Sequence, residues 1–318
     1  MKEKCDRILK AVGDVFVGEE SLLRKLLCAS LANGHVLFED YPGLGKTLLS
    51  KVFAKTLGCK WKRIQFTPDL MPADIIGTRI WKYKTSEFKL EKGPIFTNIL
   101  LADEINRSPP KTQSALLEAM EERQVTIEGI TYRLDQPFFV IATQNPIELE
   151  GTYPLPEAQM DRFLLRLRTG YVSSLDKECE ILRRRIKWQT DDPTDKIKPI
   201  VTVKEFREMQ LKCERDVYVD EQILQYIVKI VRKTREHPKV EVGASHRGGL
   251  ALLKISRAMA ASVGRDFVTP DDVKLFAKDA LAHRVILKVE YALEGVDTGE
   301  VVDEVLQEIE VPKDYLPR

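Results

Sequence analysis

The sequence predicts an α/β domain, with a parallel sheet flanked by helices, followed by an all-helical domain. Three observations lead to this prediction. An apolar stretch at residues 36–38 runs into a glycine-rich loop and then into a helical pattern. A second apolar stretch, residues 99–102, ends in two carboxylates, as expected at the carboxyl edge of a buried parallel strand. From about residue 171 onward, apolar residues recur at helical spacing alone.

The loop after the first strand has the composition of a phosphate-binding loop. A bound phosphate chain needs bare backbone N–H groups, a mobile ammonium and a hydroxyl that can ligate Mg²⁺. Asp40 stands where the strict motif has glycine, and its carboxylate could repel a triphosphate. Taken alone, the stretch also fits a chance glycine-rich turn. The predicted nucleotide-binding residues of the loop are Pro42, Gly43, Leu44, Gly45, Lys46, Thr47 and Leu48, with Thr47 also a metal ligand.

The segment before the loop offers a candidate site for the base of a nucleotide. Residues 1–33 show helical periodicity in two pieces, separated by an apolar turn that contains Val17 and Gly18. An apolar turn just upstream of a phosphate loop can form an adenine pocket. Ordinary core packing explains the same residues equally well, so both interpretations stay open.

The elements expected downstream of the loop follow from periodicity, capping residues and turn signals. Gly58 is expected to end the first helix, and Ser108 to cap the helix that follows the acidic strand. In chain order we expect a helix at 47–57, a strand at 60–66, a short helix at 72–77, a hairpin at 78–94, a strand at 99–104, a helix at 109–122, a second hairpin at 124–134 and strands at 138–143 and 163–167.

The acidic strand end is the expected partner of the phosphate loop. Asp103 would hold Mg²⁺, mostly through water, and Glu104 would polarise an attacking water. A strand that merely ends in surface acids is common. Here the acids follow the loop by about 55 residues, with a helix, a strand and an insertion between them, so coincidence is improbable.

Two further polar residues flank the last predicted strands. Asn145 follows the strand at 138–143, where an amide can bond a γ-phosphate or orient water and also begin an Asn-Pro turn. Arg162 directly precedes the strand at 163–167. From the residues alone, an ordinary surface salt bridge is as good an explanation of this arginine as a functional role.

Composition restricts the possible partners and compartment. Fifty basic and forty-nine acidic side chains leave a net charge of +1, so bulk electrostatics do not support binding to nucleic acid or an anionic membrane. No run approaches the roughly 18 to 20 apolar residues of a spanning helix. Five scattered cysteines form neither a zinc motif nor a disulfide framework. We therefore expect a cytoplasmic protein with reduced, structural cysteines.

The second half of the chain is expected to be helical throughout. Capping-box spacings occur at Thr202 with Glu205 and at Thr269 with Asp272. The proline- and aspartate-rich stretch at 190–199 is expected to be a loop. Helices are predicted at 174–187, 202–214, 220–236, 245–263, 270–284 and 298–309.

Taken together, these motifs resemble the MoxR family of AAA+ ATPases over nearly the whole chain. The resemblance implies a AAA+ core at 1–170, with hairpin inserts near 78–94 and 124–134, and a helical lid at 171–318. The stretches that carry it are PGLGKT, LLADEINRSPPKTQSALLEAMEERQVT, IATQNPIELEGTYPLPEAQMDRFLL, GASHRGGLALL and RDFVTPDDV.

The resemblance also assigns roles to individual residues. Lys46 and Thr47 match the Walker A pair, and the acids at 103–104 match Walker B. Asn145 matches the first sensor, Arg162 the arginine finger offered to a neighbour's nucleotide, and Arg247 the second sensor in the lid. Two residues depart from the family pattern: Asp40 in the loop, and His246 where proline usually precedes the second sensor.

The expected function follows from this family. Its members bind ATP and Mg²⁺, typically form hexameric rings and remodel or activate protein clients, often with a von Willebrand A-domain partner. One alternative is a scaffold that binds ATP, assembles and hardly turns over. Another is a small-molecule kinase, which would need an acceptor pocket but no Arg162.

Overall fold

A five-stranded parallel sheet lies at the centre of the first domain. The computed structural model describes residues 1–146, 151–313 and 315, so residues 147–150 of the quoted motifs lie outside it. Buried apolar side chains dominate three of the strands, β1, β5 and β8, as expected for a sheet covered on both faces. In spatial order the strands are β2 (Trp61–Gln65), β5 (Ile99–Asp103), β8 (Phe139–Gln144), β1 (Val36–Glu39) and β9 (Leu165–Leu167).

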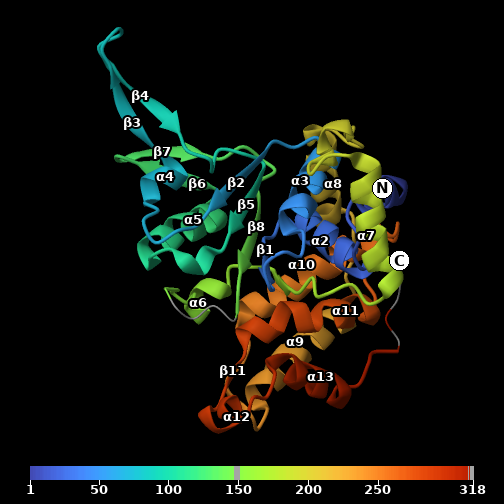
Figure 1. Cartoon of the computed structure of the whole chain (residues 1–318). Helices are drawn as coiled ribbons and strands as arrows, with labels where there is room; N and C mark the ends of the chain where they lie inside the picture. The colour runs from blue at the N-terminus through green and yellow to red at the C-terminus, as the bar shows by residue number, and fades with distance from the viewer. Residues whose placement is uncertain (147–150, 314, 316–318) are drawn as a thin grey trace.

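Helices cover both faces of this sheet, which confirms the predicted α/β architecture (Figure 1). Alternate residues of β5 point to opposite faces. Leu101 joins a cluster with Phe53 of α3 (Lys46–Thr56), whereas Leu100 joins one with Leu116 of α5 (Pro110–Glu122). The expected helix after the loop ends as predicted, because Gly58 adopts a left-handed φ of +64° just beyond it.

The helix after the acidic strand begins one residue later than predicted. Ser108 does not cap it: Pro109 is the capping residue and Pro110 the first helical one. The Ser108 hydroxyl instead donates back to the carbonyl of Ile105, 3.4 Å away, in the short 3-10 turn Ile105–Arg107. Local bonding by serine competes with helix capping, which explains the error.

Both predicted hairpins are present. The short helix α4 (Pro72–Ile76) leads into β3 (Gly77–Lys82) and β4 (Glu87–Lys92), which project away from the core (Figure 1). The second hairpin pairs β6 (Gln124–Ile127) with β7 (Ile130–Arg133). Its two turn residues both have positive φ, as a tight two-residue hairpin turn requires.

The second half of the chain is mainly helical, but it is not helical throughout as predicted. Two short strands, β10 (Val240–Val242) and β11 (Ile286–Leu287), pair antiparallel within it. These strands hold only three and two residues, too few for strand periodicity to be seen in the sequence. The helices are α7 (Leu175–Trp188), α8 (Val203–Arg215), α9 (Glu221–Glu236), α10 (His246–Ser262), α11 (Pro270–Leu281), α12 (Val289–Leu293) and α13 (Thr298–Glu308), with 3-10 turns η2 (Pro193–Lys196) and η3 (Ala282–Arg284).

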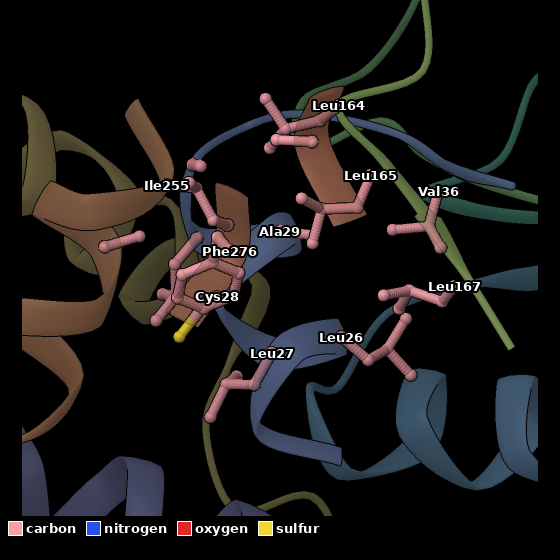
Figure 2. Close-up of a cluster of buried hydrophobic side chains, with 14 of the residues drawn as sticks. Leu26, Leu27, Cys28, Ala29, Val36, Leu164, Leu165, Leu167, Ile255 and Phe276 are labelled. Carbon is pink, nitrogen blue, oxygen red and sulfur yellow. The ribbon is translucent and has the colours of Figure 1, made fainter. Parts of the chain in front are cut away.

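The N-terminal helices α1 (Lys2–Gly13) and α2 (Glu20–Leu31) connect the two halves. Figure 2 shows α2 between the sheet, represented by Val36 and Leu165, and the helical half, represented by Ile255 and Phe276. Leu26 of α2 is fully buried in this cluster. One continuous core therefore links the sheet to the helical half, which limits how independently they can move.

Candidate nucleotide site

The phosphate-binding loop connects β1 to the N-terminus of α3. Gly43 and Gly45 have φ values of +83° and +76°, which side-chain-bearing residues rarely adopt. A Cβ at Gly45 would also lie 3.2 Å from the ring of Phe16. The loop therefore needs glycine at position 45, and it leads directly into the N-terminus of α3, where an anion binds favourably.

Lys46 lies at the first turn of α3 among three acids. Its Nζ donates to the carbonyl of Tyr41, 2.8 Å away. Burial lowers the pKa of Lys46, while the charges of Asp40, Asp103 and Glu104 act in the opposite direction. The loop and the acidic strand end thus meet at one place, as the sequence predicted, and a phosphate would give the ammonium a stronger acceptor than a carbonyl.

A cavity of about 320 Å³ adjoins the loop on its apolar side. The predicted adenine-pocket residues Val17 and Gly18 line it, together with Gly45. Side chains from the start of the helical half complete it, namely Tyr171, Ile181 and Trp188. Ile181 and Trp188 had no recognisable signal in the sequence, because α7 reads only as an amphipathic helix, and Tyr171 lies in the segment that precedes it. The lining suits a flat, mostly apolar base.

The side chain of Asp103 is held on both carboxylate oxygens. Its Oδ1 accepts from the hydroxyl of Thr143, 2.6 Å away. Its Oδ2 accepts from Arg63, at 2.6 Å from Nη2 and 3.1 Å from Nε. The sequence analysis predicted neither partner, Thr143 nor Arg63. One signal was present for Arg63: the strand WKRIQ carries several polar residues, whereas a strand buried on both faces would carry apolar ones.

Glu104 follows β5 in a left-handed conformation, with φ of +56°. Its N–H donates to the Thr143 hydroxyl at 2.8 Å, and its Oε2 accepts from Nε2 of Gln65 at 2.6 Å. Arg107 forms an ion pair with the same carboxylate at 3.2 Å. The carboxylate is therefore held by Gln65 and Arg107, the backbone of Glu104 is held by Thr143, and the side chain is only partly exposed, ready to orient a polar ligand.

Asn145 lies directly after β8, at the same carboxyl edge of the sheet as the acid pair. Its backbone carbonyl accepts a hydrogen bond from Nδ2 of Asn106 at 3.4 Å. The position agrees with the predicted one, and the proposed role of its amide stays a prediction. The donor set of this edge, the Thr47 hydroxyl and the Asp103 carboxylate, consists of hard oxygen atoms and fits Mg²⁺.

Asp40 does not point freely at the phosphate loop. It is 6 % exposed, and its two carboxylate oxygens accept from the N–H groups of Thr169 at 2.6 Å and Gly170 at 3.2 Å. The carboxylate therefore ties the loop entrance to the segment that leads into the helical half. These two hydrogen bonds reduce the concern that the Asp40 carboxylate repels a triphosphate. The charge of Asp40 also favours the protonated form of Lys46.

The two predicted arginines lie together, at a distance from the loop. Arg162 and Arg247 both pair with Glu121, at 3.2 Å and 2.5 Å. They line a cavity of about 440 Å³ that also includes His35, which precedes β1, whereas the phosphate loop follows β1. The arginines thus lie at the opposite end of the sheet from Lys46, and the structure does not bring Arg247 to the nucleotide site of its own chain.

The departure at position 246 leaves the start of α10 intact. His246 is the first residue of the helix, and the preceding Ser245 caps it by accepting from the N–H of Arg247 at 3.1 Å. Arg284 of η3 anchors the neighbouring segment through Asp161, at 2.6 Å. Arg247 of α10 also pairs with Asp161, at 3.9 Å, so the helix that carries Arg247 is held against the segment that carries Arg162.

Comparisons with known proteins agree with this geometry. A family model described as "ATPase family associated with various cellular activities (AAA)" matches residues 35–165, and an AAA lid domain model matches residues 232–305. Chaperone MoxR1 of Mycobacterium tuberculosis is 41 % identical, over 97 % of this chain and 82 % of that protein. The chain belongs to the MoxR family of AAA ATPases.

Other relatives support the same assignment. The uncharacterized protein YeaC of Bacillus subtilis is 47 % identical, over 96 % of this chain and 94 % of that protein. A crystal structure from Cytophaga hutchinsonii has a TM-score of 0.90 and 40 % identity, and the match covers 98 % of this chain and 96 % of that one. As a MoxR-family member the chain is an ATPase, so the small-molecule kinase alternative is set aside. Among the described residues, no helix is long and apolar enough to cross a membrane.

Proposed function

We propose that this MoxR-family ATPase binds ATP with Mg²⁺, assembles into a ring, a hexamer by family resemblance, and uses ATP hydrolysis to remodel protein clients. The family accounts for the ATPase activity. The metal, the ring and the clients are the proposed parts.

The position of Arg162 and Arg247 carries the proposal for a ring. Both lie at the end of the sheet opposite the phosphate loop, and Glu121 holds both. The Nε of Arg162 is buried and has no hydrogen-bond partner within the part of the chain that the structure describes. Two clustered guanidiniums suit a phosphate group. The two arginines can contact a nucleotide phosphate only if that nucleotide is bound to a neighbouring subunit.

The residues at the loop supply the rest of the chemistry. Lys46 would bind the terminal phosphates, and Mg²⁺ would neutralise charge on them when bound. Glu104 would orient the attacking water, and the amide of Asn145 would position it. A neighbour's Arg162 would then stabilise the charge that develops in the transition state, a contribution of roughly 10³ to 10⁵ in rate in comparable systems.

Mixing two inactive variants tests whether the finger acts between subunits. Lys46→Ala should lose nucleotide binding, and Arg162→Ala should bind ATP but hydrolyse it poorly. In a mixed ring, a Lys46→Ala subunit still presents Arg162 to the intact nucleotide site of an Arg162→Ala neighbour. Steady-state phosphate release should therefore partly recover on mixing.

Two controls make the mixing experiment decisive. Sedimentation must show that the variants co-assemble, and a mixture of Arg162→Ala with an Arg162→Ala, Lys46→Ala double variant should stay inactive. Co-assembly without recovered activity would contradict action of Arg162 on a single neighbouring site. Full activity of Arg162→Ala alone would also contradict it.

Protein clients are the proposed substrate because a long hairpin projects from the core and a relative is named as a chaperone. The β3–β4 hairpin exposes Trp81, Tyr83 and Phe88, which can contact an unfolded segment or a partner such as a von Willebrand A-domain protein. A Glu104→Gln variant loaded with ATP should retain clients. Loss of that capture when Tyr83 and Phe88 become serine, with ATP binding unchanged, would support the hairpin as the contact.

The alternative of an ATP-gated scaffold rests on poor turnover. Its main support was the expectation that the Asp40 carboxylate repels ATP. The hydrogen bonds that this carboxylate accepts from Thr169 and Gly170 weaken that expectation. Phosphate release by the assembled wild type separates the two functions. Sustained turnover favours the remodelling ATPase, whereas stoichiometric ATP binding with assembly and no turnover favours the scaffold.

A further inference from the structure

Arg63 binds the carboxylate of Asp103, the predicted metal ligand. Its guanidinium donates twice to Oδ2 of Asp103, at 2.6 and 3.1 Å, and its Nη2 also donates to Oε1 of Gln65 at 2.6 Å. The Asp103 side chain is only 14 % exposed, so little of it is left for water. The contact is a charge-assisted, two-point interaction, stronger than a loose surface pair.

The sheet places this arginine at the mouth of the nucleotide site. In the parallel pairing of β2 with β5, Gln65 lies opposite Asp103, and Arg63 lies two residues earlier on the same face. That face is the one covered by α3, because Trp61 on it bonds Ser50 of α3 at 3.2 Å. The guanidinium therefore reaches Asp103 from the side on which the phosphate loop lies.

Other charges around this point do not replace Arg63. The charges of Asp103 and Glu104 act to raise the pKa of Lys46, but the Nζ of Lys46 donates to the carbonyl of Tyr41. Arg107 pairs with Glu104 at 3.2 Å. Arg63 is thus the cation that contacts the Asp103 carboxylate directly, at 2.6 Å.

We propose that Arg63 is a built-in counter-cation that neutralises Asp103 when no metal is bound and is displaced by Mg²⁺, so that it sets how strongly nucleotide binding depends on the metal. The inference rests on the proposed Mg²⁺–ATP site. Without metal, Arg63 lets a triphosphate approach a neutral ion pair instead of a bare carboxylate. With metal, Mg²⁺ and the guanidinium would compete for the same carboxylate, so the arginine makes metal binding weaker than it would otherwise be.

The test measures equilibrium binding of a fluorescent ATP analogue with excess Mg²⁺ and with excess EDTA. In Arg63→Ala, affinity in EDTA should fall because Asp103 repels the triphosphate. Affinity in Mg²⁺ should stay the same or rise because the metal no longer has a competitor. The ratio of the two dissociation constants should therefore increase, on the order of tenfold for a partly screened charge contact.

Matched variants separate this effect from general damage. Arg79→Ala removes an arginine from β3, where it lies over the ring of Phe88, and should leave the ratio unchanged. Arg63→Gln keeps a polar side chain and should behave like Arg63→Ala if charge is what matters. If a thermal unfolding measurement shows that Arg63→Ala is not folded, the binding measurements are made on Arg63→Gln.

Three results would overturn the inference. An unchanged ratio in both Arg63 variants would make the contact an ordinary strand-end ion pair. Loss of Mg²⁺-dependent binding in a folded Arg63 variant would mean that Arg63 holds Asp103 in place for the metal. An increase in EDTA affinity would reverse the expected sign. Failure of the wild type to bind nucleotide even with Mg²⁺ would instead contradict the proposed nucleotide site.

Discussion

A single hydroxyl orients both acids at the end of β5. Thr143 donates to Asp103 at 2.6 Å and accepts the backbone N–H of Glu104 at 2.8 Å. It is itself buried, at 2 % exposure. The geometry of the acid pair therefore depends on a neutral residue of the adjacent strand, which acts through the acids and does not itself meet the substrate.

Replacing Thr143 by valine keeps its shape and removes this hydroxyl. The partly buried N–H of Glu104 then loses its acceptor, which should cost roughly 1 kcal/mol in the free energy of unfolding. Turnover should fall more than nucleotide affinity, because the acids are misplaced while Lys46 is unchanged. Denaturant unfolding, phosphate release and analogue binding measure the three quantities. Thr126→Val, on the exposed side of the second hairpin, should change none of them appreciably.

Glu104 and Lys46 should separate chemistry from binding. Glu104→Gln removes the charge that polarises water but leaves the phosphate contacts, so ATP should stay bound while hydrolysis stops. Lys46→Ala should lose binding itself. Analogue titration and single-turnover phosphate release distinguish the two variants. An equal loss of nucleotide affinity in both would refute the assigned roles.

Asp40 should matter mainly for the connection between the loop and the helical half. Asp40→Asn keeps one acceptor oxygen, but the amide nitrogen that replaces the other cannot accept from Thr169 or Gly170. Stability should fall by roughly 1 kcal/mol, because one of these partly buried N–H groups loses its acceptor. ATP affinity should change little or fall. Clearly tighter ATP binding in Asp40→Asn would restore the view that this charge repels the nucleotide.

At the scale of elements, α2 is the helix on which both halves pack. Figure 2 shows its side chains between the strands on one side and the long helices on the other. Its apolar residues are buried around most of the helix, which is typical of a helix enclosed by a core. Damage to α2 should therefore weaken the whole structure and not one half.

Leu26→Ala tests this role of α2. Leu26 is 0 % exposed, and its truncation should cost about 2 to 5 kcal/mol and lower the unfolding transition as a single cooperative step. Leu182→Ala on α7, where the leucine is 66 % exposed, is the matched control and should change stability by less than about 0.5 kcal/mol. Two separate transitions in Leu26→Ala would show that the halves unfold independently.

At the scale of the whole molecule, ion pairs on the surface add to the core that joins the halves. Lys51 of α3 pairs with Asp192, which precedes η2, and Lys4 of α1 pairs with Glu205 of α8 at 2.8 Å. The hydrogen bond from Lys51, followed by that from Thr194, lowers the pKa of Asp192 to about 2. The bond from Lys4, with those from Thr202, lowers the pKa of Glu205 to about 2.

These shifts predict a loss of stability in acid. Carboxyls with lowered folded-state pKa values stabilise the fold above their ordinary pKa near 4, and that contribution disappears as the pH falls toward 2. Denaturant midpoints measured between pH 7 and 2 should decline over this window. The decline should be shallower in Asp192→Asn, and Lys51→Met should have the same effect because it removes the partner of Asp192. An unchanged slope in both variants would show that the pair adds nothing.

The sequence alone predicted most of the architecture and the residue types of the site. Loop glycines, apolar strands and capping residues are local signals, so the phosphate loop at Lys46, the acid pair at 103–104 and both hairpins could be located from them. The resemblance then supplied the family. The small sheet of β10 and β11 was missed because strands of two or three residues have no measurable periodicity.

Only the tertiary structure decided which side chains meet. The contacts of Arg63 with Asp103, of Asp40 with the segment after β9, and of Arg162 and Arg247 with Glu121 all join residues about 40 to 130 positions apart. Chain crossovers and strand order set such pairings, and neither leaves a periodic trace in the sequence. For that reason the sequence determined the chemistry available to this protein, whereas the fold determined that the acids lie at one end of the sheet and the two arginines at the other.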